Sequence, residues 1–455
     1  MGCRRISFLS YSLPRRTAEE THTPALLLRY SRGPKKVSGQ SGWLKKQTRY
    51  LFSNGILSFA GDDTMDRDMA VKMAQEAIKA QNKQLVDAVL RIKAERERAP
   101  AAEKSIEDLP LIGVTCSTGW ECYAIVEELT KTRNFRVRAT YRTPGTQAAQ
   151  RLADLLQETE KTHAGLLSLQ SGIDMYSEET LTKAFADCDG VVLYVTANSA
   201  KAGKISNHGN DPEGGRAAVM RQVMAMIGAI RANPSIKHAV TLVFPRDKVR
   251  GIVDAAPEAP WWVQQRLRVS DFLRMAGVNV TCIHRPSYYF NMHRVDYTAK
   301  ADFRGDTALS RTLIKENTVP GIMEPDYMVN WVDVRDVGKW VGTVFEYPEV
   351  FSDVDFCIAS CALTGNQRVE VCKKINKHGT PFKYKQFPKL IMKTIALFNE
   401  EVVYPLRYTQ WYNDEGNAYD FSCNEDLADL ERIHPLWTFE KKLIDWGIDE
   451  IKPGK

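Results

Sequence analysis

No stretch of eighteen apolar residues occurs in this 455-residue chain, so the sequence predicts no transmembrane helix. Its nine cysteines include no CxxC pair. The two nearest to each other, Cys357 and Cys361, have no accompanying Cys or His pair that would complete a zinc spacing. We therefore expect no metal site. Scattered thiols of this kind are typical of proteins in a reducing compartment.

Net positive charge is missing from most of the chain. Residues 1–50 contain eleven Lys or Arg and two Glu and carry +9, so the remaining 405 residues sum to −3. A nearly neutral body argues against a nucleic-acid partner. The segment 1–60 instead has the Arg- and Ser-rich composition of a transit peptide or a disordered segment, which favours a mitochondrion or plastid. Glu19 and Glu20 are unusual in transit peptides, so the cytoplasm stays open.

Proline and glycine are absent from Asp62 to Arg98, which predicts one long helix ended by Pro100. Within 61–107, this helix is followed by a linker. Its apolar seam has spacings of three and four: Val71, Ala74, Ile78, Gln81, Leu85, Ala88 and Ile92. A seam with two alanines and a glutamine is weak, so we prefer a helix lying on the main domain. The alternative is a helix that binds a protein partner or forms a homodimer.

The stretch Leu109–Arg142 predicts a strand, a turn, a helix and a second strand. These are Pro110–Val114, Gly113–Gly119, Trp120–Leu129 and Phe135–Tyr141. In such a βαβ unit, the pyrophosphate of a dinucleotide binds at the N-terminus of the helix. A βα turn that binds no ligand is the alternative.

The glycine pattern of this turn is incomplete. The common spacing is G-x-x-G-x-x-G, and Cys116 stands where the middle glycine would be. Its side chain takes space that the backbone needs to approach a cofactor, which would weaken binding. A helix N-terminus also lowers the pKa of a thiol, so a redox-sensitive Cys116 is a second interpretation. A small core residue is the third.

Strands and helices continue to alternate as far as residue 283, which predicts an α/β fold with a doubly wound parallel sheet of the Rossmann type. We expect a dinucleotide-binding domain at 108–290 and a smaller C-terminal α+β lobe at 291–455, with elements returning to the main sheet. The N-terminal helix is an extension of this fold. Residues 199–212 are polar and glycine-rich, which predicts a surface loop.

Several short motifs, taken in order, resemble the NmrA-like branch of the atypical short-chain dehydrogenases. They are Gly113–Gly119, Arg138-Ala-Thr-Tyr-Arg142, Gly172-Ile-Asp174, Val191-Val-Leu-Tyr-Val-Thr196, Gly277–Pro286 followed by Tyr288-Tyr-Phe-Asn-Met292, and Val329–Gly338 with its sequence DVRDVG. The resemblance extends over about 109–440. It implies an NAD(P)-binding domain with a substrate or partner lobe, in a family of reductases and of regulators that bind the cofactor without turnover.

The resemblance also implies a set of cofactor-binding residues. In the phosphate-binding turn they are Gly113, Thr115, Cys116, Ser117, Thr118 and Gly119; farther along the chain they are Arg142, Asp174, Thr196 and Asn198. Arg142 matches the arginine that contacts the 2′-phosphate, and Arg138 adds a second basic residue nearby, so NADP(H) is favoured over NAD(H). A solvated charge remains the alternative for Arg142, and a helix cap for Asp174.

The acid–base pair of short-chain dehydrogenases, Tyr-x-x-x-Lys, is missing: none of the seventeen tyrosines has Lys four residues later. The lysine that the family keeps aligns with Arg266, which can polarise a carbonyl but cannot cycle as an acid. His284 and His293 are the nearby titratable residues. Two hypotheses follow. One is hydride transfer to a carbonyl or quinone with Arg266 or His284 in the catalytic role. The other is a non-catalytic redox sensor or structural subunit.

Overall fold

The computed structural model describes most of the chain from residue 67 onward. The described residues are 67–98, 105–195, 199–201, 204–206, 212–243, 269–288, 317–321, 323–388, 390, 394, 424–445 and 447–452. All of them fall within the second of the chain's two compact units, Gln47–Lys455. The basic segment 1–60 lies outside the described residues. So do Thr196, Asn198, Arg266 and His293.

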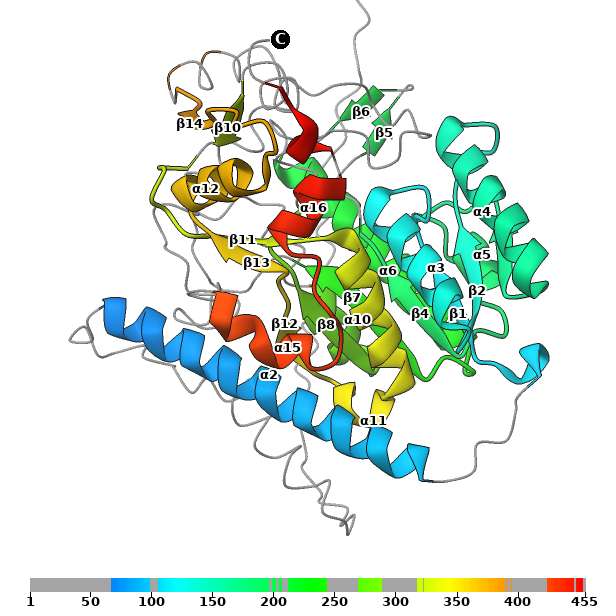
Figure 1. Cartoon of the computed structure of the whole chain (residues 1–455). Helices are drawn as coiled ribbons and strands as arrows, with labels where there is room; N and C mark the ends of the chain where they lie inside the picture. Colours follow the sequence, from blue (N-terminus) through cyan, green and yellow to red (C-terminus); the bar gives the residue numbers. More distant parts are fainter. Residues whose placement is uncertain are drawn as a thin grey trace, which may run out of the picture. The chain divides into compact units, whose positions relative to one another are not determined.

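A seven-stranded parallel sheet forms the centre of the described fold (Figure 1). In spatial order its strands are β3 (Leu167–Gln170), β2 (Arg136–Thr140), β1 (Leu111–Val114), β4 (Gly190–Leu193), β7 (His238–Val243), β8 (Val280–His284) and β12 (Asp355–Cys357). Every residue of β1, β4, β7 and β8 is buried, as expected for parallel strands covered on both faces. The strand order reverses between β1 and β4, where doubly wound sheets bind their ligands.

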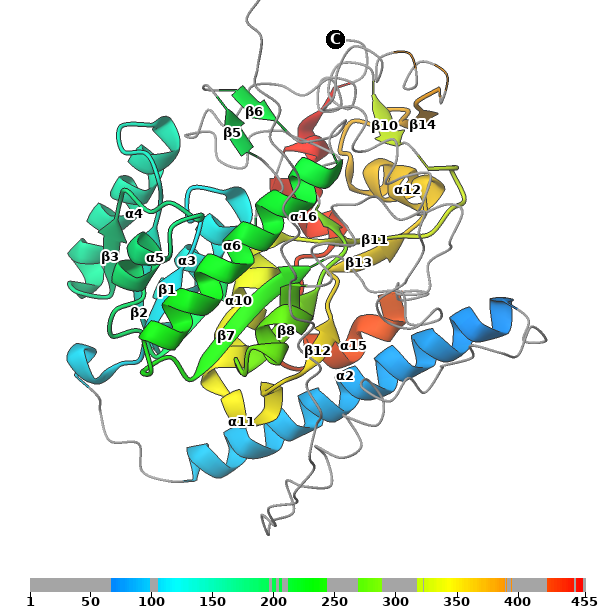
Figure 2. The same cartoon turned by 180° about the vertical axis from the view of Figure 1, so that it is seen from behind.

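Helices cover both faces of this sheet (Figures 1 and 2). One face carries α3 (Trp120–Thr132), α4 (Gln147–His163) and α10 (Val334–Glu346). The other carries α5 (Glu178–Ala184), α6 (Pro212–Ala232) and the helical segment 269–275. The glycine of the DVRDVG motif allows α10 to approach α3 closely, because a Cβ on Gly338 would lie 2.9 Å from the carbonyl oxygen of Ala124.

Two small sheets and a separate apolar cluster form the C-terminal lobe. β9 (Ser287–Tyr288), β11 (Val329–Val332) and β13 (Cys361–Leu363) make one sheet, and β10 (Thr318–Gly321) pairs with β14 (Lys383–Gln386) in the other. The cluster includes side chains of α12 (Gly365–Ile375) and α16 (Phe439–Asp445). The remaining short elements are η1 (Ile106–Asp108), α11 (Pro348–Phe351), η2 (Asn424–Leu427), α15 (Ala428–Glu431) and η3 (Ile448–Glu450).

The long helix α2 (Arg67–Glu97) lies along the edge strand β12 and packs against α11 and α15. Two buried amides of α2 bond to the outward carbonyls of this strand. Gln81 Nε2 donates to the carbonyl oxygen of Asp355 at 2.6 Å, and Asn82 Nδ2 donates to that of Cys357 at 2.9 Å. The glutamine of the predicted seam therefore faces the main domain, as we preferred. A partner on the other faces of α2 stays a prediction.

The predicted fold class is confirmed: the central sheet is parallel and has helices on both faces. The C-terminal part of the chain adds β12 to this sheet. The region expected to be a surface loop, 199–212, instead contains an antiparallel hairpin of β5 (Ser199–Lys201) and β6 (Lys204–Ser206). Its polar residues gave no apolar alternation from which strands could be predicted. Among the described helices, none is long and apolar enough to cross a membrane.

Candidate functional site

The turn between β1 and α3 lies at the carboxyl edge of the sheet and keeps the backbone geometry of a glycine turn. Cys116 has a φ of 54°, which is the left-handed region that glycine adopts readily and other residues rarely do. The Gly119 N–H donates to the carbonyl oxygen of Cys116 at 2.8 Å and closes the turn. A Cβ at Gly119 would lie 3.3 Å from that same oxygen, so glycine suits the close approach.

The hydroxyls of Thr115 and Ser117 bond within the protein. Thr115 Oγ1 donates to the Val192 carbonyl at 3.0 Å and accepts from the Tyr194 N–H at 2.8 Å, which joins β1 to β4. Ser117 Oγ donates to the Val114 carbonyl at 2.9 Å and accepts from the Thr140 N–H at 3.1 Å. Both residues are buried. They set the shape of the turn, and the surface offered to a ligand comes from Cys116, Thr118 and Gly119, which are at least partly exposed.

The N-terminus of α3 has the properties of an anion site. Gly119 is its N-cap and supplies no capping side chain. The positive end of the helix dipole and the first N–H groups of a helix favour a phosphate at such a position. One acidic residue, Glu121, lies in this first turn, and its carboxylate is bonded to Arg285 at the end of β8.

The thiol of Cys116 is not activated by the helix. Burial raises its pKa to about 12, and the charge of Arg142 lowers it only in part. Its Sγ lies 3.8 Å from the carbonyl oxygen of Tyr194. Desolvation of the thiolate therefore outweighs the attraction of Arg142, which contradicts the expectation of a lowered pKa at this thiol.

Arg138 within β2 and Arg142 just after it have different surroundings. Arg142 is exposed, and its carbonyl oxygen accepts a hydrogen bond from the Gly172 N–H at 3.0 Å, which joins the ends of β2 and β3. Arg138 instead donates to the carbonyl oxygens of Ala184 and Ala186, at 3.2 and 2.5 Å, at the C-terminal end of α5. Arg138 is therefore engaged with the end of α5 and does not supply the second basic residue near Arg142 that we expected. Arg142 itself is exposed.

Asp174 organises the start of α5. Its Oδ1 accepts from the Tyr176 N–H at 3.0 Å, and its backbone N–H and carbonyl both bond to Thr180 Oγ1, at 3.1 and 3.0 Å. The N-cap of the helix is Ser177, whose hydroxyl accepts from the Thr180 N–H. Asp174 is exposed and follows β3, so the turn role and the position beside a cofactor are compatible.

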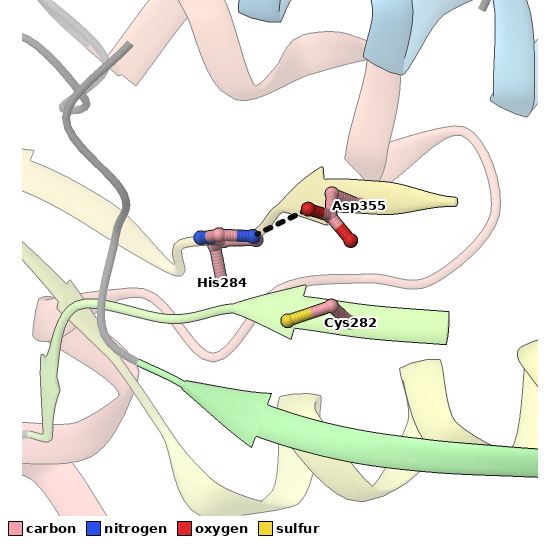
Figure 3. A group of neighbouring side chains, drawn as sticks. All are labelled: Cys282, His284 and Asp355. Atoms are coloured by element: carbon pink, nitrogen blue, oxygen red, sulfur yellow. Dashed lines mark ion pairs between the residues drawn. The ribbon is translucent and has the colours of Figure 1, made fainter. Parts of the chain in front are cut away.

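His284 ends β8 and is buried, with 2% of its surface exposed. It forms a group with Cys282 and Asp355 whose donor atoms all lie within 4.8 Å of one another (Figure 3). His284 Nε2 lies 3.6 Å from Asp355 Oδ2. In the figure, the imidazole points toward the carboxylate, and Cys282 lies beside them on β8.

An arginine completes this buried group. Arg274 donates a hydrogen bond to the Asp355 carboxylate. Burial acts to lower the pKa of Arg274, but Asp355 raises it overall, so the guanidinium is charged. A metal ion among these donors would lie beside a guanidinium, which the repulsion between the two cations disfavours. The ion pair accounts for the buried carboxylate without a metal ion.

Sequence reasoning missed two arginine contacts beside the turn. One is the Glu121–Arg285 pair, whose partners are 164 positions apart in the chain. The other is Arg151 of α4, which donates to the Thr118 carbonyl at 3.3 Å and lies 5.0 Å from the ring centroids of both Trp120 and Tyr123. The only signal in the sequence was the position of Arg285 beside Pro286 in a family motif. Such a motif does not identify the residue that its arginine contacts.

Comparison with known proteins identifies the family of the chain. The model of the NmrA-like family matches residues 110–445. The chain belongs to this family. No curated protein matches the chain in sequence.

Similar solved structures include both regulators and enzymes of the same fold. NmrA, a negative transcriptional regulator in complex with NADP, is 12% identical with a TM-score of 0.52, over 75% of this chain and 95% of that chain. The Citrobacter sp. triphenylmethane reductase complexed with NADP(H) is 14% identical with a TM-score of 0.51, over 74% and 99%. A Staphylococcus aureus nucleoside-diphosphate-sugar epimerase is 12% identical with a TM-score of 0.51, over 75% and 100%. At such identities the similarity establishes the fold, and the NmrA-like site has to be argued from its own residues.

Proposed function

We propose that this NmrA-like protein binds a nicotinamide dinucleotide at the carboxyl edge of its sheet, with NADP(H) preferred to NAD(H). The observation that carries the proposal is the β1–α3 turn. Its left-handed backbone at Cys116 and its glycine N-cap leave the N-terminus of α3 open to a pyrophosphate. NmrA has been solved in complex with NADP and in complex with NAD, so that protein accepts both cofactors.

The preference for NADP(H) rests on Arg142. It is exposed at the end of β2, where dinucleotide folds hold the adenosine ribose. A guanidinium there can donate two hydrogen bonds to a 2′-phosphate. An NAD-preferring site has an acidic residue for the ribose hydroxyls at that place.

We infer that the dinucleotide acts as a ligand rather than as a co-substrate. When bound, a reduced nicotinamide supplies a hydride, but turnover also needs a group that gives or takes a proton. His284 is buried beside an ion pair, and the sequence has no Tyr-x-x-x-Lys. The described residues therefore offer this site groups that bind and position, and no evident acid or base.

Reduction of a carbonyl or quinone is the second candidate. It is supported by the fold shared with the triphenylmethane reductase. Arg266 would then polarise the substrate carbonyl.

The binding proposal is tested by titrating the protein with NADPH and NADH while following the fluorescence of its nine tryptophans. Arg142→Ala should weaken NADPH binding by about tenfold to a hundredfold, the worth of a charge-assisted hydrogen-bond pair, and leave NADH binding unchanged. Lys161→Ala is the matched control, since Lys161 is an exposed cation in the last turn of α4. Absence of a saturable response to either cofactor refutes the proposal.

Turnover separates the two candidates. NADPH absorbance is followed over a range of protein concentrations with a panel of quinones and aromatic carbonyls. Saturable binding without consumption supports a ligand role. Consumption that depends on protein concentration and is lost in Arg266→Ala supports the reductase.

A further inference from the structure

A buried ion pair lies directly behind the proposed phosphate site. Arg285 Nε donates to Glu121 Oε1 at 3.0 Å, and Arg285 Nη2 donates to Glu121 Oε2 at 3.2 Å. The contact is bidentate, and the two residues are only 3% and 4% exposed. Arg285 is fixed to the sheet through its N–H, which donates to the Val243 carbonyl at 3.1 Å.

The position of Glu121 is unusual for a helix that accepts an anion. It is the second residue of α3, within the first turn. A negatively charged carboxylate at this position is itself attracted by the helix dipole. Its negative charge opposes a phosphate at the same end of the helix, because like charges at this separation repel.

Arg285 removes this conflict. Its guanidinium neutralises the charge of Glu121 inside the protein. The low dielectric there strengthens the attraction between the two groups and raises the free-energy cost of leaving either charge unpaired. The fork of two hydrogen bonds also ties the first turn of α3 to the end of β8. The N-terminus of α3 then offers its own positive potential to a ligand, without the opposition of Glu121.

We propose that Arg285 is a positioning residue of the dinucleotide site, which tunes phosphate affinity by neutralising Glu121. The inference rests on the dinucleotide function proposed above. It predicts opposite effects on affinity for the two residues: loss of Arg285 lowers the affinity for the dinucleotide, and loss of the charge on Glu121 raises it.

Three variants test these opposite effects on affinity by NADPH titration. Arg285→Met leaves a buried carboxylate about one helical turn from the phosphate and should weaken binding on the order of tenfold to a hundredfold. Glu121→Gln keeps the shape and leaves Arg285 positive, and should tighten binding severalfold. The double variant Glu121→Leu/Arg285→Met restores neutrality with apolar groups and should return to within about threefold of the wild type.

Arg138→Met is the matched control, because it removes a part-buried guanidinium that bonds to carbonyls at the end of α5. It should lower the melting temperature and leave dinucleotide affinity within about twofold. Melting curves of every variant identify the folded fraction, and the double variant keeps the test valid if Arg285→Met alone does not fold.

A pair that only braces the helix gives a different pattern. Glu121→Gln and Arg285→Met would then weaken binding alike and the double variant would not recover, which overturns the inference. A wild-type protein that binds neither NADPH nor NADH refutes the proposed function instead, so the two failures are distinguishable.

Discussion

Replacing Cys116 by glycine should stabilise the protein and tighten dinucleotide binding. Cys116 has a φ of 54°, and a non-glycine residue in this conformation costs roughly 1–2 kcal/mol. Glycine removes that cost but adds roughly 0.5–1 kcal/mol of backbone entropy to the unfolded chain. The net gain is about 0.5–1 kcal/mol, which urea unfolding of the two proteins side by side can resolve.

Cys116→Ala separates backbone strain from the volume of the thiol. Alanine keeps the Cβ and the strained φ but removes the Sγ that lies 3.8 Å from the Tyr194 carbonyl. If the thiol obstructs the cofactor, the alanine and glycine variants should both bind NADPH more tightly than the wild type, and only the glycine variant should be more stable. A glycine variant no more stable than the alanine variant would refute the strain reasoning. Unchanged affinity in both would show that the thiol is no obstacle.

Three further predictions concern stability. Gln81→Leu should cost about 1–3 kcal/mol in urea unfolding, because it strands a buried carbonyl of β12, whereas Gln84→Leu on the exposed face of α2 should cost little. Burial lowers the pKa of His434 to about 4, so the free energy of unfolding should fall by roughly 3 kcal/mol as the pH drops from 6.5 towards 4. The melting temperature should fall with it, and His434→Asn should flatten that slope. Lys442→Met leaves the buried Asp333, 3.1 Å away, with one cation fewer and should cost about 3 kcal/mol, and unfolding no easier than wild type would contradict this.

The parallel sheet was predictable because its strands are buried on both faces. Val191 to Leu193, for example, are fully buried, and such strands leave continuous apolar runs in the sequence. A second local signal is Ser177, the N-cap of α5, whose hydroxyl accepts from the backbone N–H three residues ahead. Both signals depend on neighbouring residues alone.

Contacts between distant residues left no such signal. Gln81 is a weak point of an apolar seam in the sequence, and only the folded chain brings it to the Asp355 carbonyl. Glu121 meets Arg285 in the same way. The pKa of Cys116 was misjudged because the helix dipole is visible in the sequence, whereas the extent of desolvation depends on packing.

The two amides of α2 also decide how this protein can be divided. β12 ends the parallel sheet, and Gln81 and Asn82 occupy its outward carbonyls in place of an eighth strand. A fragment that begins after α2 would expose those carbonyls to any free strand of another molecule, which is a common origin of edge-to-edge aggregation. The helix α2, an extension of the Rossmann-type fold, therefore belongs in any fragment meant to avoid this pairing.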